Sequence, residues 1–94
     1  MSSPDPPHAL EIDLHGHTVD RAKRRLLQEL TRARALRISP ILVVTGKGHG
    51  SAGGSAKLRP AVEAWLRGPE GRALGVRTLR EAGKGGAFSV ELAR

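Results

Sequence analysis

The stretch EIDLHGHTVD, residues 11–20, places the carboxylate of Asp13 and the imidazole of His15 two positions apart, directly before a glycine. In an extended strand, side chains two positions apart point to the same side, so these two groups share the face opposite Leu14. An imidazole with an ordinary pKa of about 6.5 exchanges protons at neutral pH. The carboxylate can orient it, act as a base or hold a cation. The pair is therefore a candidate for acid–base chemistry, and the simpler alternative is a solvated strand end.

A glycine-rich stretch follows the second apolar segment of the chain. GKGHGSAGGSAK, residues 46–57, holds five glycines in twelve positions. Glycine amides can approach phosphate oxygens because no side chain stands in the way, and Lys47 adds a positive charge. The G-x-x-x-x-G-K-[ST] spacing of triphosphate-binding loops is absent. The stretch therefore favours phosphate binding and argues against a nucleoside triphosphate site.

Periodic patterns predict the elements that carry these groups. Alternating apolar and polar residues over 9–14 predict a half-buried strand, which Gly16 ends. Thr18 can cap a long helix whose apolar residues recur at three- and four-residue steps and whose arginines fall largely outside that stripe. This helix must end before Pro40, because the residue preceding a proline avoids helical angles.

The second half of the chain predicts three more strands and one more helix. PILVVTG is apolar on both faces, which is typical of a central strand. Apolar residues from Leu58 to Leu66 indicate a second, shorter helix, in which Pro60 is tolerable only in the first turn. VRTLREA and AFSVELAR are interpreted as two final strands joined by GKGG. The order β-α-β-α-β-β predicts an α/β two-layer sandwich, a four-stranded mixed sheet with two helices.

The predicted order also places the candidate groups. Residues 1–8, with three prolines, are expected to be a disordered tail, and residues 9–94 to form one domain. If the first two strands are parallel neighbours, the Asp13–His15 pair and the glycine-rich stretch lie at the same edge of the sheet.

Charge and composition limit the classes of protein. Sixteen Lys and Arg against nine Asp and Glu give a net charge of +7, which favours a polyanionic partner such as nucleic acid. Alternatively, the excess of positive charge reflects a high-GC genome, which favours Arg and Ala in all of its proteins. The absence of cysteine excludes disulfides and thiolate metal sites. Without a signal peptide or a long apolar run, we expect a cytoplasmic protein with no membrane partner.

Metal binding stays open at one position. His15, His17 and His49 lack a close i, i+4 pair, so we expect no structural zinc. Mg²⁺ or Mn²⁺ held loosely at Asp13 and shared with a phosphate group is compatible with the residues present.

Four segments in this order carry a family resemblance: LEIDLHGHTVDRA, ILVVTGKG, KLRPAVEAWL and GGAFSVEL. Together they resemble the Smr (small MutS-related) domain, over about residues 9–93. The family's fold resembles the C-terminal domain of bacterial translation initiation factor three, which agrees with the order derived above. The histidine that relatives often place directly before a serine is shifted here, because Gly50 separates His49 from Ser51.

The resemblance implies a function and a set of site residues. Family members with an assigned activity are endonucleases that nick DNA or cleave RNA, including messenger on stalled ribosomes. The implied catalytic residues are Asp13 and His15. The implied nucleic-acid or phosphate contacts are Gly46, Lys47, Gly48, His49 and Arg59, with His17 as a secondary contact.

Three functions follow as hypotheses. The first is a nucleic-acid-binding endonuclease of low sequence specificity, with the ribosome or a repair or recombination protein as a further partner. The second is a DNA- or RNA-binding module without catalysis. The third is a protein-interaction or small phosphate-ligand domain. Scarce aromatic residues favour recognition of backbone and shape over bases.

Overall fold

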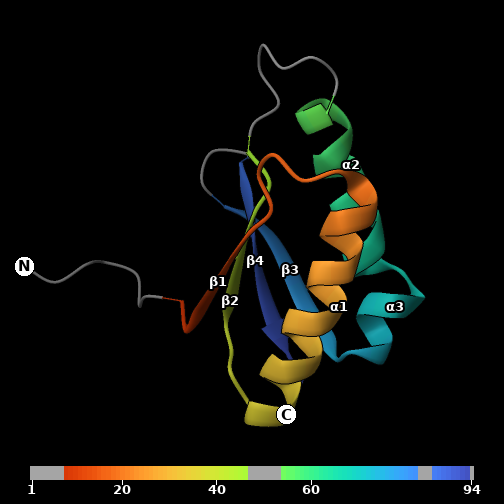
Figure 1. Cartoon of the computed structure of the whole chain (residues 1–94). Helices are drawn as coiled ribbons and strands as arrows, with labels where there is room; N and C mark the ends of the chain where they lie inside the picture. The colour runs from red at the N-terminus through yellow and green to blue at the C-terminus, as the bar shows by residue number, and fades with distance from the viewer. Residues whose placement is uncertain (1–7, 47–53, 83–85, 94) are drawn as a thin grey trace, which may run out of the picture.

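The computed structural model describes residues 8–46, 54–82 and 86–93, with the side chains of 54–56 left undescribed. The described chain runs β-α-β-α-α-β-β (Figure 1). The elements are β1 (Leu10–Asp13), α1 (Val19–Leu36), β2 (Ile41–Val44), α2 (Gly54–Arg67), α3 (Pro69–Ala73), β3 (Val76–Ala82) and β4 (Ala87–Leu92). The predicted order of strands and main helices is confirmed, and α3 is an additional short helix.

The four strands form one mixed sheet in the order β1-β2-β4-β3. β1 and β2 are parallel, with Asp13 opposite Val44. β4 pairs antiparallel with both β2 and β3. β2 is thus an inner strand, as its apolar sequence predicts. The parallel pairing brings the carboxyl ends of β1 and β2 to the same edge of the sheet, which we call the D-L-H-G edge after residues 13–16.

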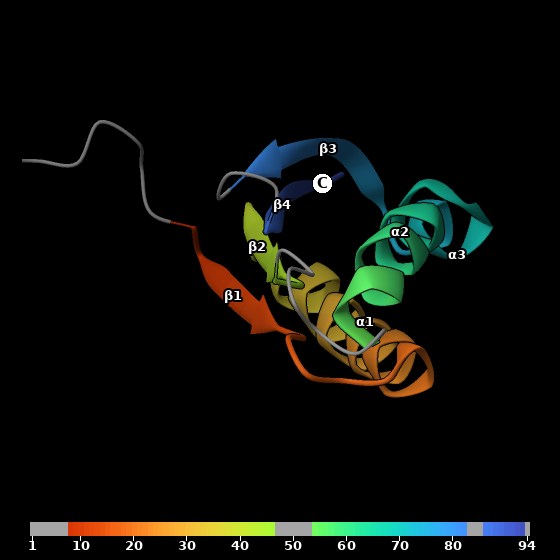
Figure 2. The ribbon, with the colours of Figure 1, turned by 90° about the horizontal axis from the view of Figure 1, so that it is seen from above.

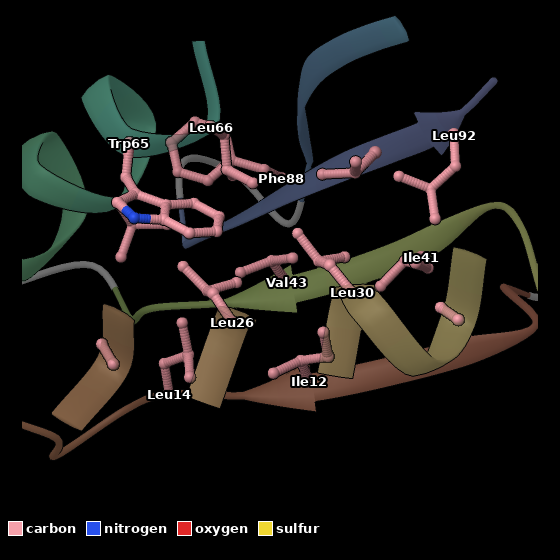
Figure 3. Packing of buried hydrophobic residues seen from close by; sticks show 14 of the residues in the cluster. Ile12, Leu14, Leu26, Leu30, Ile41, Val43, Trp65, Leu66, Phe88 and Leu92 are labelled. Carbon is pink, nitrogen blue, oxygen red and sulfur yellow. The ribbon is translucent and has the colours of Figure 1, made fainter. Parts of the chain in front are cut away.

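All helices of the described chain lie on one side of the curved sheet (Figure 2). The apolar side chains of the sheet and of the helices pack into one continuous core, in which Phe88, Leu26 and Leu30 are fully buried (Figure 3). Trp65 packs at one end of this core and remains 8% exposed. In the described residues, the other side of the sheet has no helix over it. His8, the last residue of the predicted tail, contacts that side, with its Nε2 3.0 Å from the Ser89 hydroxyl.

Helix α1 forms as its pattern predicts. The Thr18 hydroxyl accepts a hydrogen bond of 3.2 Å from the Arg21 amide, which satisfies one of the free donors of the first turn. The residues of the apolar stripe that are buried against the sheet are Ala22, Leu26, Leu30 and Ala33. The helix ends at Leu36, four residues before Pro40. Its exposed side carries most of its arginines, so the surface of α1 is basic.

Helix α2 begins earlier than predicted. It starts at Gly54, so Pro60 lies in its interior and not in the first turn. The expectation about Pro60 is therefore wrong. Pro60 is exposed, and at an exposed position solvent can hydrogen-bond the carbonyl that the missing proline amide leaves free. The small residues before Lys57 extend a helix that the glycine content alone argues against.

Helix α3 turns the chain back toward the sheet. Pro69 occupies its first turn, where a proline's missing amide costs nothing. Gly71 is buried, and a side chain there would collide with the Leu66 carbonyl. The close approach of α3 to the end of α2 therefore requires glycine. No helix in the described ranges has the length and apolarity to cross a membrane.

Candidate functional site

The D-L-H-G edge brings the two predicted stretches together. The Leu14 amide continues the pairing of β1 by donating a 2.7 Å hydrogen bond to the Val44 carbonyl. On the next strand, a Cβ placed on Gly46 would lie 3.9 Å from the Cβ of His15. The backbone of the glycine-rich stretch therefore begins in contact distance of the histidine, although Gly46 and His15 are far apart in the sequence.

Asp13 and His15 form an exposed pair at this edge. Their side chains are 55% and 73% exposed, and Leu14 between them is fully buried. One Asp13 carboxylate oxygen accepts a 3.1 Å hydrogen bond from the His15 backbone amide. The same oxygen lies 3.8 Å from the imidazole Nδ1, which is too long for a hydrogen bond. Carboxylate and imidazole are thus neighbours that both face solvent, where a substrate can reach them.

A tight turn connects the pair to α1. The His17 amide donates a 3.0 Å hydrogen bond to the Leu14 carbonyl, and His17 itself is half-buried. Gly16 has a φ of +82°, a backbone conformation that side-chain-bearing residues avoid. Apart from its two chain neighbours, no described residue has an atom within 4 Å of a Cβ built on Gly16, so the positive φ, and not a lack of space, requires the glycine here.

Replacing Gly16 with alanine is expected to lower the free energy of unfolding by about 1 kcal/mol, because alanine is strained at this positive φ. Urea denaturation measures the difference. Gly16→Asn is the matched control, because asparagine tolerates the left-handed region better and should cost less. Equal stability of wild type and Gly16→Ala would contradict the strain argument.

Arg25 reaches the edge from α1. Its Nη1 donates a 2.8 Å hydrogen bond to the backbone carbonyl of Asp13, and its Nε lies 3.9 Å from Glu29. The contact ties the first turns of α1 to the last residue of β1. It also places a guanidinium beside the Asp13–His15 pair, which adds positive charge to this edge.

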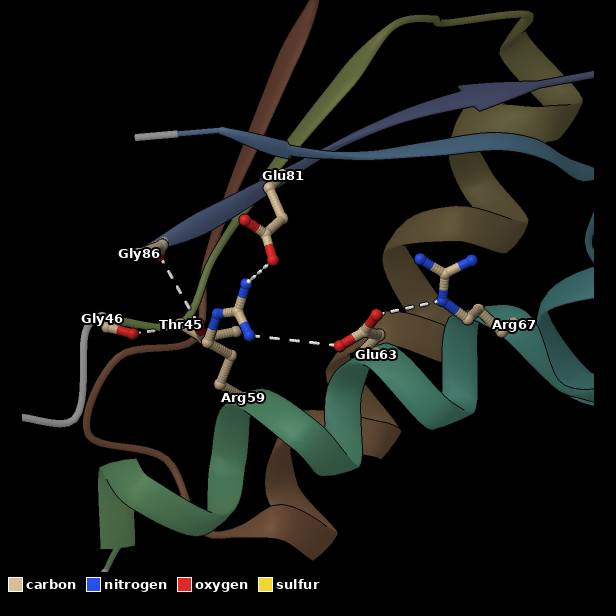
Figure 4. A network of polar contacts seen from close by, with 7 residues as sticks. All are labelled: Thr45, Gly46, Arg59, Glu63, Arg67, Glu81 and Gly86. Carbon is tan, nitrogen blue, oxygen red and sulfur yellow. Dashed lines mark hydrogen bonds and ion pairs between the residues drawn. The ribbon is translucent and has the colours of Figure 1, made fainter. Parts of the chain in front are cut away.

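The end of β2 is held against the start of β4. The amides of Thr45 and Gly46 both donate to the Gly86 carbonyl, at 2.9 Å and 3.0 Å. The Thr45 hydroxyl is fully buried and donates to the Gly46 carbonyl at 3.1 Å, and it lies 3.5 Å from the Gly86 carbonyl (Figure 4). These contacts fix the backbone from which the glycine-rich stretch departs.

Arg59 lies near Thr45 and forms a network of ion pairs with neighbouring carboxylates (Figure 4). Its Nη2 is 2.8 Å from Glu81 of β3, and its Nη1 is 4.0 Å from Glu63 of α2. The guanidinium carbon lies 4.9 Å from the centre of the Phe88 ring, in cation–π range. Arg59 lies in the second turn of α2, because the helix begins at Gly54. The contacts with Glu81 and Phe88 therefore link Arg59, and with it α2, to the sheet.

Three of the predicted phosphate contacts cannot be placed in this site. Lys47, Gly48 and His49 lie outside the described residues. Within the described ranges, no group of three or more His, Asp or Glu side chains is arranged to hold a metal ion. Asp13 offers a single exposed carboxylate, so a cation there would need phosphate and water as further ligands.

Sequence reasoning missed Arg25, Thr45 and Glu81 as parts of this edge. Thr45 had a signal, since a threonine that ends an apolar strand before a glycine must satisfy its hydroxyl. Arg25 and Glu81 contact residues 12 and 22 positions away in the chain. No local spacing indicates such contacts.

Fold and site together define the class: a two-layer α/β domain with an exposed carboxylate–imidazole pair beside the start of a glycine-rich stretch. The family model of the Smr domain matches residues 12–93. The crystal structure of the Smr domain of Thermus thermophilus MutS2 superimposes with a TM-score of 0.70 at 34% sequence identity, covering 89% of this chain and 98% of that one. No curated protein matches the chain. The chain belongs to the Smr domain family.

Proposed function

We propose that this domain is an endonuclease that cleaves phosphodiester bonds of DNA or RNA with little sequence specificity. Smr domains are associated with nucleic-acid binding and nuclease activity. The observation that carries the proposal is the exposed Asp13–His15 pair, which lies next to Gly46 in a chain with a net charge of +7. A basic surface attracts the phosphate backbone, and the pair supplies groups that can move a proton.

On RNA the proposed step is transesterification. The ribose 2′-hydroxyl loses its proton to His15 as its oxygen attacks the neighbouring phosphorus. The bond from phosphorus to the 5′-oxygen breaks, and the 5′-oxygen takes a proton from water. His15 is the proposed proton-transfer group. Asp13 accepts a hydrogen bond from the His15 amide and so holds the strand end in place. Arg25 and the proposed phosphate loop from Gly46 to His49 offset the charge that develops on the phosphate.

On DNA the 2′-hydroxyl is missing, so water must be the nucleophile. Its oxygen attacks phosphorus while its proton passes to His15, and the 3′- or 5′-oxygen leaves and takes a proton from solvent. A divalent cation at Asp13 would help by activating the water and by offsetting the negative charge of the phosphate. The exposed carboxylate is compatible with that role, and its remaining ligands would come from substrate and water.

A non-catalytic nucleic-acid-binding module is the second candidate. It is favoured by the 3.8 Å between Asp13 and the His15 imidazole, since no hydrogen bond from a described residue holds the ring in a productive orientation. Catalytic hydrogen bonds are often long in the free protein and shorten when substrate binds. The two candidates differ in one result: a binding module binds nucleic acid and leaves it intact.

The test is incubation of the protein with end-labelled single-stranded RNA, stem-loop RNA and supercoiled plasmid, each with Mg²⁺, Mn²⁺ or EDTA. Cleavage that Asp13→Ala and His15→Ala both remove, with binding and folding retained, supports the endonuclease. Ends with a 2′,3′-cyclic phosphate identify transesterification, whereas nicked plasmid that requires a metal identifies hydrolysis. Binding without cleavage supports the module. Undetectable binding of all three substrates contradicts both.

A further inference from the structure

A hollow of about 890 Å³ lies at the opposite end of the sheet from Asp13. It is formed by the last turn of α1, the residues just before β2, the end of β4 and Arg77 at the start of β3. β1 and β2 start at this end and finish at the D-L-H-G edge, so the length of the sheet separates the two places (Figure 1). We call it the distal hollow.

Arginines dominate the charge of the distal hollow. Arg34, Arg37 and Arg77 line it, and all three are exposed. Glu91 is the acidic residue among the lining side chains, and one of its carboxylate oxygens lies 3.4 Å from the Thr78 hydroxyl. Among the described residues, none of the three arginines forms an ion pair within 4.0 Å. The hollow therefore carries three guanidinium groups against one carboxylate, and none of the three is ion-paired with a described acidic side chain.

The backbone that carries these arginines is held by hydrogen bonds. Arg37 ends α1 in a left-handed conformation with a φ of 58°, and its amide donates to carbonyls of the last helical turn. Arg34 donates a 2.6 Å hydrogen bond to the Ala73 carbonyl. The Leu92 amide donates to the Ser39 hydroxyl at 3.0 Å, which joins the end of β4 to the segment before β2. The backbone beneath Arg34 and Arg37 is thus fixed, so binding an anion orders only their side chains.

We propose that the distal hollow is a second phosphate-binding site, which holds the backbone of the same nucleic acid that meets the D-L-H-G edge. The guanidinium fork matches phosphate geometry, and three guanidinium groups against one carboxylate favour an anion. The six residues of β4, at about 3.4 Å each, span about 20 Å between the two ends. At about 3.4 Å per nucleotide along a duplex, that corresponds to roughly six nucleotides. This inference rests on the proposed function, because it assumes a nucleic-acid ligand.

The test measures binding of fluorescein-labelled probes of about 20 nucleotides, long enough to reach both places, as duplex DNA and as RNA hairpin. Anisotropy is recorded for wild type, Arg37→Gln/Arg77→Gln and the matched control Arg24→Gln/Arg32→Gln. The control removes the same charge from exposed positions of α1. Arg34 is left intact because its hydrogen bond to Ala73 links α1 to α3.

The distal double variant is expected to bind about tenfold more weakly than wild type at low salt. The slope of log K against log salt concentration should become shallower by about two. The control double variant should lose less than about threefold. The charge-preserving Arg37→Lys/Arg77→Lys should recover most of the affinity. The DNA and RNA probes show which nucleic acid supplies the phosphates.

A second measurement does not depend on the stability of the variants. In the wild-type protein, the NMR signals of the Arg37 and Arg77 side-chain Nε–Hε groups should shift when either probe is added. Unshifted signals, or equal affinity losses in the two double variants, would overturn the distal site. If wild type binds neither probe, the proposed function fails as well. If wild type binds and only the distal effects are missing, this inference alone fails.

Discussion

Replacing His15 with alanine is expected to slow phosphodiester cleavage by about 10²–10⁴-fold while changing nucleic-acid affinity by less than about twofold. Proton transfer by a positioned side chain contributes a factor of this size. The imidazole is 73% exposed and makes no hydrogen bond to Asp13 through its ring, so its removal should leave the fold intact. Single-turnover cleavage at saturating protein separates the rate of the chemical step from binding.

His8→Ala is the matched control for this experiment. It makes the same substitution at a residue that contacts Ser89 on the uncovered side of the sheet, outside the D-L-H-G edge. It should cleave at the wild-type rate. Equal cleavage by wild type and His15→Ala would mean that another group, or a contaminating nuclease, carries out the reaction.

Replacing Phe88 with alanine is expected to lower the free energy of unfolding by about 3–5 kcal/mol, because the ring is fully buried and its loss leaves a cavity. A domain of 94 residues has a total stability of about 5–14 kcal/mol. The substitution therefore removes a large share of it. The ring also lies 4.9 Å from the guanidinium of Arg59, so the network near Gly86 should loosen as well. Urea denaturation followed by circular dichroism measures the loss.

Phe88→Leu separates the two roles of the ring. Leucine keeps most of the apolar volume and should cost less than about 1.5 kcal/mol, while it removes the cation–π contact with Arg59, worth about 0.5–1 kcal/mol near the surface. A loss below about 1 kcal/mol in Phe88→Ala would contradict the central place of this ring in the core.

Local patterns in the sequence determined most of the fold. The alternation over residues 9–14 and the three- and four-residue steps after Thr18 predict β1 and α1, because burial of one face imposes those periods. The same alternation puts Asp13 and His15 on one side of buried Leu14, as the structure has it. The start of α2 was missed because residues 54–56 carry little periodic signal and include glycine and serine, whose helix propensity is weak.

Only the tertiary structure decided which distant groups meet. The parallel pairing of β1 with β2 brings Gly46 to His15, and the crossover through α1 brings Arg25 to the Asp13 carbonyl. The order β1-β2-β4-β3 likewise places Glu81 beside Arg59 and gathers Arg37 and Arg77 around one hollow. These contacts join residues far apart in the chain. Local periodicity reports which side of an element is buried, but it carries no information on which element packs beside it.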